Sequence, residues 1–308
     1  MEKLAYILSS ALSASAAVMY ATLGELLSQK AGTLNLGLEG VMLVGAMTGF
    51  VVTYTTGSIA LALLVTVLVG AALGLLFSFM TVTLRANQVV CGLALVSFGT
   101  GISGYLGKSY MSKTLAVKCS KIAIPFLSRI PLIGEFLFNQ DILVYGLYLL
   151  VPLMYFFIYR TNKGLELRAI GDNPAAMDAS GVNVFRARYI YTIIGTAIVA
   201  LGGAYLTMAH TTTYTDNATA GEGWIASALV IFSFWNPLLA ALGSLFFGLI
   251  SIFALRLQLM GIPISSFFIS MLPYISTILV LIVSATGKGR KLGHAPSSLG
   301  ICYDRELR

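Results

Sequence analysis

Long apolar runs without charge dominate this chain and restrict it to a membrane. Residues 58–84, 142–159 and 189–209 contain no Asp, Glu, Lys or Arg. A helix needs about 20 predominantly apolar residues to cross the hydrocarbon core of a bilayer. Charged residues make up only 10% of the chain, against about 25% in soluble domains. A soluble globular fold is therefore excluded, and the sequence predicts an all-α integral membrane protein.

The apolar runs predict a single transmembrane domain over residues 1–308, a polytopic bundle of about 8–10 transmembrane helices. The first run resembles a signal peptide in its small residues, but it continues far enough to be a retained span. Pro237 breaks a long uncharged stretch, so the short piece before it is a span or a re-entrant segment. Pro273 predicts a kink in the last span. The expected spans are residues 4–28, 33–56, 58–84, 86–107, 142–159, 189–209, 224–235, 237–256 and 267–286.

The distribution of Lys and Arg predicts the orientation. The 160–188 loop and the C-terminal tail are rich in basic residues and are expected in the cytoplasm, whereas the 210–223 loop has none and is expected outside, like the N-terminus. The basic residues concerned are Arg160, Lys163, Arg168, Arg186, Arg188, Lys288, Arg290, Lys291, Arg305 and Arg308. Residues 108–141 are also expected outside, although they hold Lys108, Lys113, Lys118, Lys121 and Arg129, because long loops obey the rule less strictly.

Other features describe packing and exclude some kinds of site. The pairs Gly45/Gly49 and Gly70/Gly74 have GxxxG spacing, which favours close approach of helices inside one bundle. The net charge of +7 fits basic cytoplasmic loops and does not indicate nucleic-acid binding. The cysteines are odd in number and form no CxxC or Cys/His cluster, so neither disulfides nor a metal site is expected.

Motifs for chemistry are missing. Residues 99–109 resemble a phosphate-binding loop, but Ile102 stands where that motif requires glycine. The histidines, His210 and His294, have no partners nearby, and Glu39 is the only carboxylate expected deep in a span. Because ion-coupled carriers usually hold more ionisable residues inside their spans, transport powered by another polypeptide is favoured. An ion-coupled carrier or channel acting without an ATPase is the alternative, and a membrane-embedded enzyme is a third class for which no catalytic constellation is present.

The stretch GDNPAAMDASG at 171–181 predicts one short helix in the basic loop. Asn173 fits an N-cap, Pro174 fits the first helical position, and Gly181 fits a left-handed stop. Asp172 adds negative charge near the positive end of the helix. A helix over 174–180 is too short to be stable alone and needs a partner surface. An ordinary capped loop helix is the alternative interpretation.

This stretch and its flanks, GLELRAIGDNPAAMDASGVNV, resemble the cytoplasmic coupling loop of ABC importer permeases. The branch is that of sugar and nucleoside permeases, related to ribose and branched-chain amino-acid permeases. Further stretches are similar to that branch in the same order along the chain: AGTLNLGLEGVMLVGA, AGEGWIASALVIFSFWNPLLAALGSLFFG, MLPYISTILVLIV and APSSLGICYDR. The chain looks most like the shorter permease subunit of nucleoside ABC transporters.

The resemblance implies a membrane permease subunit for a nucleoside or related simple sugar, located in the bacterial plasma (inner) membrane. Its implied partners are an ABC ATPase subunit with two nucleotide-binding halves, a second permease homologue and an extracytoplasmic substrate-binding lipoprotein. The chain itself is expected to be no enzyme and to hold no cofactor. The implied ATPase-coupling residues are Gly171, Asp172, Asn173, Pro174, Ala175, Ala176, Met177 and Gly181. Ala175 stands where the older importer loop pattern has Glu, so a contact that depends on that Glu is not carried over.

Several polar or aromatic residues are candidates to line the substrate pathway. Asn35 and Glu39 lie in LNLGLEG, where Gly37 and Gly40 are expected to loosen the helix beside a cavity. The other candidates can stack on a nucleoside or hydrogen-bond to it: Asn87, Gln88, Phe98, Trp224 and Asn236. For each of them, helix packing or anchoring at the membrane interface is the alternative.

Overall fold

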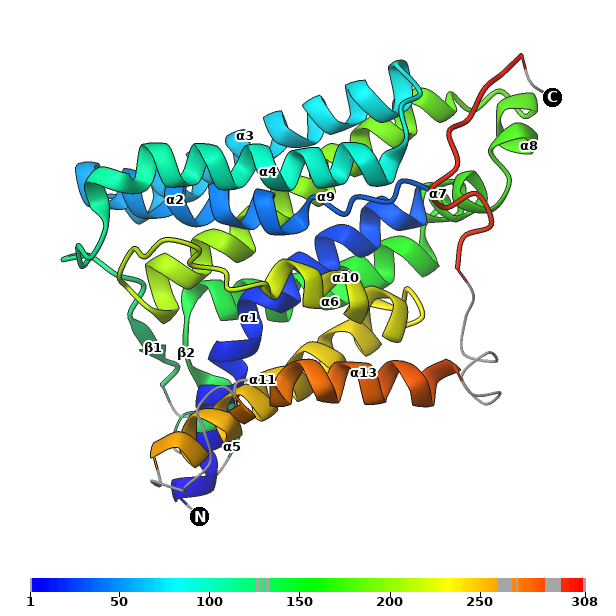
Figure 1. Cartoon of the computed structure of the whole chain (residues 1–308). Helices are drawn as coiled ribbons and strands as arrows, with labels where there is room; N and C mark the ends of the chain where they lie inside the picture. The colour runs from blue at the N-terminus through cyan, green and yellow to red at the C-terminus, as the bar shows by residue number, and fades with distance from the viewer. Residues whose placement is uncertain are drawn as a thin grey trace.

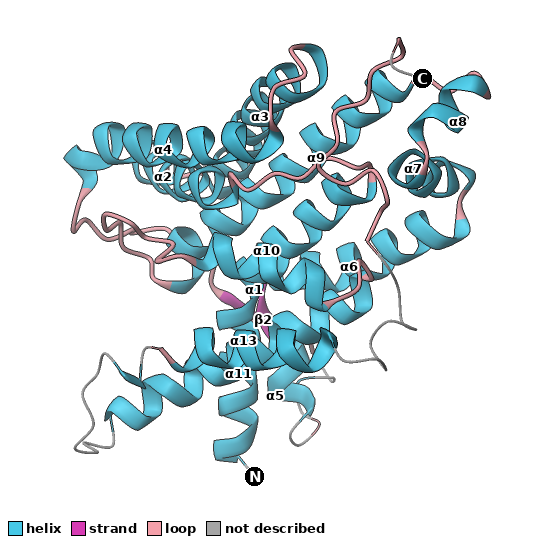
Figure 2. Cartoon of the chain, turned by 45° about the vertical axis from the view of Figure 1, so that its right-hand side comes forward, coloured by secondary structure: helices cyan, strands magenta, loops and turns pink. Residues whose placement is uncertain are grey.

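A computed structural model describes residues 2–125, 128, 130, 133–259, 268–269, 271–285 and 295–306. Long helices make up almost all of it (Figures 1 and 2). The helices are α1 (Glu2–Lys30), α2 (Leu38–Thr56), α3 (Ile59–Ser78), α4 (Gln88–Gly107), α5 (Ile133–Phe138), α6 (Ile142–Arg160), α7 (Asn162–Asp172), α8 (Pro174–Ala179), α9 (Val184–Tyr205), α10 (Glu222–Phe232), α11 (Pro237–Leu259) and α13 (Leu272–Ala285). Two short strands, β1 (Lys121–Ala123) and β2 (Asn139–Asp141), pair antiparallel.

The helices confirm a polytopic membrane bundle. In the described part of the chain, seven helices are long and apolar enough to cross a membrane: α1, α2, α3, α4, α6, α9 and α11. The expected span 224–235 corresponds to α10, which has 11 residues. At about 1.5 Å per residue α10 is only about 16 Å long, too short to cross the hydrocarbon core alone. It is therefore a short helix inside the bundle.

The last expected span, 267–286, lies partly outside the described residues. Its described helix, α13, has 14 residues. The kink predicted at Pro273 is not tested inside α13, because this helix begins one residue before Pro273 and residue 270 lies outside the described residues. Pro273 is the second residue of α13, where a missing backbone N–H costs no helical hydrogen bond.

Two further boundaries differ from the prediction. Residues 31–37 are not helical, so α2 begins at Leu38 and not at 33. The expected 160–188 loop holds α7 as well as the short α8, and α9 begins inside it at Val184. The side chain of Asn183 caps α9 by accepting a hydrogen bond from the Arg186 N–H at 3.0 Å. Apolar length alone could not show the starts of α7, α8 and α9, because polar caps define them.

Helix α9 lies at the centre of the bundle, with α1, α2 and α3 packed around it. The GxxxG pairs make this packing possible. A Cβ added at Gly45 would lie 2.1 Å from the Ala200 carbonyl oxygen, and one added at Gly70 would lie 2.6 Å from the Ala200 Cβ. The predicted close packing is confirmed, and α9 is the helix that both glycine pairs contact.

One end of the bundle gathers α7, α8 and the C-terminal tail (Figure 1, right). Arg85, in the turn between α3 and α4, forms an ion pair with Asp304 of the tail. The Ser298 N–H donates to the Gly171 carbonyl at 2.9 Å, which ties the tail to the end of α7. The turns after α1 and α3, the 160–188 region and the tail therefore share one end.

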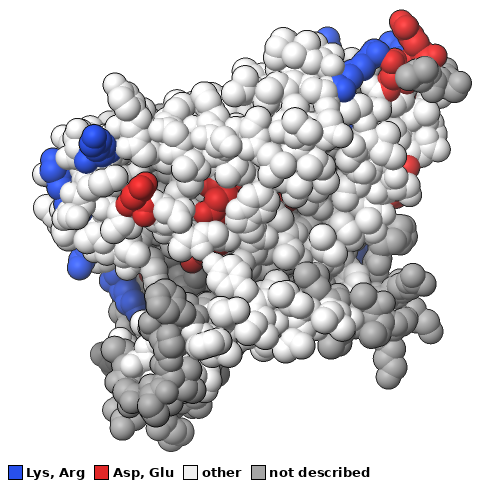
Figure 3. All heavy atoms as spheres, viewed as in Figure 1, with Lys and Arg blue, Asp and Glu red and all other residues white. Residues whose placement is uncertain are grey.

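The opposite end holds β1, β2 and the 210–216 segment. The Ser112 N–H donates to the Tyr214 carbonyl at 2.9 Å, and the Ser13 hydroxyl donates to the Gln140 Oε1 at 3.0 Å. The lysine-bearing 108–125 segment therefore shares an end with 210–216 and with the first part of α1. On the face drawn in Figure 3, Lys and Arg gather toward the two ends, and most of the surface between them is uncharged.

Candidate functional site

Helix α8 has the caps that its sequence predicts. The Asn173 Oδ1 accepts a hydrogen bond from the Ala176 N–H at 3.0 Å, and Pro174 is the first helical residue. At the other end Gly181 has φ +87°. The Gly181 N–H donates to the Asp178 carbonyl at 3.0 Å, and the Val182 N–H donates to the Met177 carbonyl at 3.1 Å. This pair of bonds is a Schellman motif, which stops the helix with a glycine in the left-handed conformation.

Little of α8 is covered. None of its six residues, all of which the structure describes, is buried. Ala176 is exposed, and Pro174, Ala175 and Met177 are partly exposed. A two-turn helix in which no residue is buried as a whole gains little from packing, so it presents a surface more than it supports the bundle.

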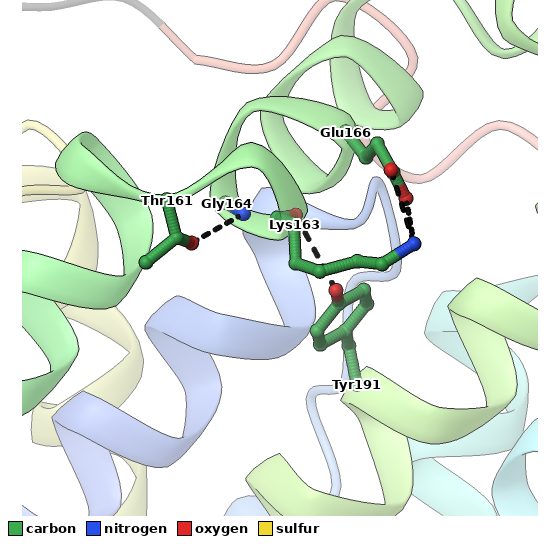
Figure 4. Close-up of polar contacts among 5 residues, drawn as sticks. All are labelled: Thr161, Lys163, Gly164, Glu166 and Tyr191. Atoms are coloured by element: carbon green, nitrogen blue, oxygen red, sulfur yellow. Dashed lines mark hydrogen bonds and ion pairs between the residues drawn. The ribbon is translucent and has the colours of Figure 1, made fainter.

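Polar contacts hold the corner between α6 and the start of α7, the helix that precedes α8 (Figure 4). The Thr161 Oγ1 accepts a hydrogen bond from the Gly164 N–H at 3.0 Å and so caps α7. The Tyr191 hydroxyl of α9 donates to the Lys163 carbonyl at 3.4 Å. Lys163 also forms an ion pair with Glu166 at 2.8 Å, and this hydrogen bond raises the pKa of the exposed Lys163 amine.

The predicted coupling residues Gly171 and Asp172 join α8 to the rest of this end. A Cβ added at Gly171 would lie 2.3 Å from the Lys30 carbonyl oxygen, so only glycine allows α7 to approach the end of α1 this closely. The Asp172 Oδ1 accepts a hydrogen bond from the Ser297 N–H at 3.4 Å. The position of α8 is therefore linked to the ends of α1 and of the chain.

Side chains satisfy the non-helical backbone at 31–37. The Glu25 Oε1 accepts hydrogen bonds from the Asn35 N–H at 3.0 Å and from the Gln29 side chain at 2.9 Å. The Gln88 Oε1 accepts from the Leu34 N–H at 2.7 Å. Irregular backbone inside a membrane protein is tolerated when its polar groups are paired in this way. Of the pathway candidates, Asn35 therefore lies in this segment and Gln88 pairs with it.

Glu39 joins two helices that begin inside the bundle. Its carboxylate accepts hydrogen bonds from the Gly221 N–H at 2.9 Å, from the Gly223 N–H at 2.8 Å and from the Thr219 hydroxyl. Glu39 lies in the first turn of α2, and its carboxylate oxygens bind backbone N–H groups at the start of α10. A carboxylate between two helix N-termini faces the positive ends of both dipoles. Glu39 therefore fastens the start of α10 to the start of α2.

The glycines around Glu39 serve packing. The backbone before α2 is irregular up to Gly37, but Gly40 lies in the regular first turn of α2, so the expectation that Gly40 loosens the helix is wrong. A Cβ added at Gly40 would lie 2.4 Å from the Leu95 carbonyl oxygen. Gly40 thus lets α4 lie directly against α2.

The remaining candidates fall into two groups. The side chains of Asn87 and Asn236 are caps: the Oδ1 of each accepts a backbone hydrogen bond, from Val89 and Leu238 respectively, at 3.0 Å. The side chains of Phe98 and Trp224 are instead 46% and 42% exposed.

The two aromatic candidates lie on helices that flank the start of α2. The residue after Phe98, Gly99, packs against the Gly40 backbone, and the residue before Trp224, Gly223, packs against Glu39. The backbones of Phe98 and Trp224 therefore lie close to the start of α2, whereas the two asparagines lie at separate helix starts.

Sequence reasoning missed several residues of this region. Glu25, Gln29 and Thr219 hold the irregular segments, and Tyr274 of α13 donates a hydrogen bond to the Ala220 carbonyl at 2.7 Å. The Trp235 indole N–H donates to the Gln29 Oε1 at 2.7 Å across the bundle. Thr219, Tyr274 and the Gln29–Trp235 pair are not marked by any local motif, since their partners lie far away in the sequence.

A cavity of about 600 Å³ opens at the end that holds β1 and β2. Charged side chains of both signs line it, among them Lys121, Asp141 and Arg256. The Asp141 Oδ1 caps α6 by accepting from the Leu143 N–H at 3.0 Å, and burial raises the pKa of this carboxyl. No predicted site residue lines the described wall of this cavity.

Comparison with known proteins identifies the family of this chain. Residues 4–283 match the family described as branched-chain amino acid transport system / permease component. A protein of Haloferax volcanii, provisionally named a glucose ABC transporter permease, is 35% identical over 98% of each chain. A nucleoside ABC transporter permease of Lactococcus lactis is 33% identical over 93% of this chain and 92% of the relative. A guanosine ABC transporter permease of Bacillus subtilis is 31% identical over 99% of this chain and 98% of the relative.

No solved structure matches the chain. The family match and the relatives agree with the helical membrane bundle, and they favour an importer subunit over an ion-coupled carrier. Such permeases work with ATPase and substrate-binding partners and are not enzymes. The chain belongs to the branched-chain amino acid transport system / permease component family and is a multi-pass permease subunit of an ABC importer.

Proposed function

We propose that this permease carries a nucleoside and that a separate ATPase subunit with two nucleotide-binding halves drives it through α8. The observation that carries the proposal is α8 itself, a helix capped at both ends with no buried residue. Its neighbours Gly171 and Asp172 connect it to the end of α1 and to the tail. A force applied to α8 therefore reaches the membrane helices through short, well-packed contacts.

The names of two relatives, a nucleoside and a guanosine permease, support the substrate class. The exposed aromatic residues around the start of α10 are suited to it. Phe98, Trp224 and Tyr274 are each between 42% and 46% exposed. Such rings can stack on a nucleobase, and the irregular backbone beside them can hydrogen-bond to a ribose. These three residues, with Asn35, Glu39 and Gln88, form the proposed pathway region.

A simple sugar is the second candidate substrate. It is favoured by the 35% identity to the relative provisionally named for glucose. A sugar needs hydrogen bonds more than ring stacking, so it would depend less on Phe98 and Trp224 than a nucleoside would. The two candidates therefore predict different effects of aromatic substitutions.

The partners and the orientation complete the proposal. A second permease homologue pairs with this chain in a bacterial plasma (inner) membrane, and α3, α4 and α6, only 28% buried over their apolar windows, offer the faces for it and for lipid. A substrate-binding lipoprotein docks outside, at the end with β1 and β2. The tail and α8 lie in the cytoplasm, and the N-terminus lies outside, as the Lys and Arg of the 160–188 region suggest.

The test is uptake by the reconstituted complex of this chain with its ATPase, second permease and binding protein. We expect ATP-dependent uptake of labelled nucleoside, competed by other nucleosides and poorly by free ribose or glucose. Trp224→Ala should raise the KM for the nucleoside. Equal competition by ribose or glucose would transfer the assignment to a simple sugar, and uptake by this chain alone on an ion gradient would refute the ATPase-driven mechanism.

The orientation is tested by cysteine labelling in intact cells. Single cysteines at Ser180 and Thr213 are introduced into a background in which the native Cys91, Cys119 and Cys302 are replaced. A membrane-impermeant maleimide should label position 213 and not position 180. The reverse pattern would invert the proposed topology.

A further inference from the structure

The described part of the C-terminal tail, residues 295–306, lies along the same end of the bundle as α8. Ser298 anchors it: the Ser298 hydroxyl donates to the Gly171 carbonyl at 2.7 Å and accepts from the Arg188 guanidinium at 3.1 Å. The Gly300 N–H donates to the Gly32 carbonyl at 3.2 Å. The first half of the tail is thus tied to α7, to α9 and to the turn after α1.

The second half of the tail reaches the turn between α3 and α4. The Arg188 guanidinium also donates to the Ile301 carbonyl at 2.9 Å, and the Cys302 thiol donates to the Ala86 carbonyl at 3.4 Å. Asp304 forms its ion pair with Arg85 here. The tail therefore contacts four separate parts of the bundle before it ends.

The last described residues of the tail hold α8. The Asp178 carboxylate accepts hydrogen bonds from the Tyr303 hydroxyl at 3.0 Å and from the Arg305 Nε at 2.8 Å, and the Arg305 Nη2 bonds to its other oxygen. This two-point pairing is the strongest geometry available to an arginine and a carboxylate. The Asp178 side chain is only 3% exposed, although it belongs to a helix with no buried residue.

Tyr303 connects α8 with α9 as well. Its ring lies 5.7 Å from the ring of Phe185, in the first turn of α9, while its hydroxyl bonds to Asp178. A six-residue helix is not stable by itself. The contacts from the tail therefore restrain how α8 is oriented, in addition to its packing against α7 and α9.

We infer that the C-terminal tail is a clamp that orients α8, with Tyr303 and Arg305 as positioning residues for coupling to the ATPase. The inference rests on the proposed function of α8. Residues 295–306 would transmit the movement of α8 to the turns after α1 and α3, because the same short segment contacts all of them. The ATPase would then act on a helix and tail that move together.

The first test uses the purified full chain alone. Hydrogen exchange of the amides from Met177 to Val182 is measured in the wild type and in the double variant Tyr303→Phe/Arg305→Ala. We expect exchange in α8 to rise about five- to tenfold, because local opening becomes more frequent when its restraints are lost. Lys163→Ala, which breaks an exposed ion pair on α7 that does not involve α8, is the matched control and should leave this exchange unchanged. Unchanged exchange in the double variant would overturn the inference.

The second test uses the assembled transporter. The double variant should keep basal ATP hydrolysis and complex assembly but lose most of the stimulation of ATPase activity by substrate. Arg305→Lys, which keeps the charge but not the paired geometry, should restore part of the stimulation. Full stimulation in the double variant would also overturn the inference.

Gly181→Val separates this inference from the proposed function. If Gly181→Val uncouples the transporter and the double variant does not, α8 docks on the ATPase without the clamp. If neither uncouples it, the docking role of α8 itself is wrong.

Discussion

The bundle centre and the α8 end are held together by different physics. Around α9, glycines bring backbones into contact, and α1 and α2 are 78% buried over their apolar windows. At the α8 end no residue of that helix, which is fully described, is buried. Caps, backbone hydrogen bonds and two ion pairs, Arg85–Asp304 and Arg305–Asp178, hold this end instead.

This difference shows where stability and coupling reside. A packed centre tolerates no added volume, since neighbouring backbones cannot move aside. An exposed helix held by polar contacts can be shifted at low cost, which suits an element that must respond to a partner. Substitutions at the centre should therefore prevent stable folding. Substitutions at the α8 end should leave the protein folded but change how transport is coupled to the ATPase.

The largest effect is expected from Gly45→Leu. The new Cβ would meet the Ala200 carbonyl oxygen at 2.1 Å, and a backbone atom cannot rotate away. The cost should reach or exceed the about 1–3 kcal/mol of ordinary overpacking. Detergent-solubilised protein should lose its monodisperse peak in size-exclusion chromatography.

Gly101→Leu is the control for that change. Among the described residues, none lies within 4 Å of a Cβ at Gly101. The same substitution there should leave the peak intact. Equal loss in both variants would mean that added side-chain bulk, and not contact with α9, is the cause.

A large effect is also expected from Glu39→Gln, at the deep junction of α2 and α10. A Gln amide offers one acceptor oxygen where the carboxylate offers two, so at least one of its three donors loses its partner. Each buried donor left unpaired costs about 1–3 kcal/mol. Thermal unfolding followed by fluorescence should show a clearly lower Tm.

Glu25→Gln is the comparison for that variant. The Oε1 of Glu25 receives its two hydrogen bonds, and its Oε2 has no partner among the described residues. A Gln side chain can keep both bonds, so the Tm should fall less than in Glu39→Gln. A larger fall in Glu25→Gln would contradict the role given to Glu39.

A moderate and local effect is expected from Gly181→Val. Gly181 has φ +87°, which a β-branched residue adopts only with strain of about 1–3 kcal/mol. No described atom lies within 4 Å of a Cβ there, so no clash is added. The variant should reach the membrane at normal levels, bind the ATPase subunit more weakly and lose substrate-stimulated ATP hydrolysis.

Gly57→Val is the control for Gly181→Val. It introduces similar strain at the C-terminal end of α2, far in the sequence from α8. Gly57 has φ +68° and, among the described residues, equally open surroundings. Coupling should persist in this variant. If both variants uncouple the transporter, strain in general and not the position of α8 is responsible.

The smallest effect is expected from Asn173→Ala. It removes the N-cap bond to the Ala176 N–H, worth about 0.5–2 kcal/mol to the helix. Pro174 and the glycine stop remain, so coupling should weaken without being lost. Substrate-stimulated ATP hydrolysis should fall between those of the wild type and Gly181→Val. Complete loss of the stimulation in Asn173→Ala would show that the cap matters as much as the stop.

Local and periodic features were open to prediction from the sequence. Apolar length identifies the spans because hydrocarbon rejects unpaired polar backbone. The caps of α8 at Asn173 and Gly181 can also be predicted from the sequence, since a cap depends on residues only a few positions away. The GxxxG spacing of Gly45 and Gly49 predicts close packing of helices, but it does not indicate that α9 is the partner helix.

Functional proposals that rest on single residue types were less secure. Asn87 and Asn236 have the polarity expected of pathway residues, but the structure shows both as helix caps. Glu39 is the only carboxylate that the sequence places deep in a span, yet Glu25 is buried as well and pairs with the irregular segment at 31–37. Composition alone cannot separate these roles, because the same polar side chain serves either one.

The sequence by itself determined the membrane location, the helical class and the capped form of α8, all of which follow from interactions within about 20 neighbouring residues. Only the tertiary structure decided that Glu39 fastens α10 to α2 and that Asp178 meets Tyr303 and Arg305. Glu39 is separated by 182 and 184 residues from its partners Gly221 and Gly223. Asp178 is separated by 125 and 127 residues from Tyr303 and Arg305. Such contacts exist only once the helices between them have packed, because the backbone must first bring each donor within hydrogen-bond distance of its acceptor.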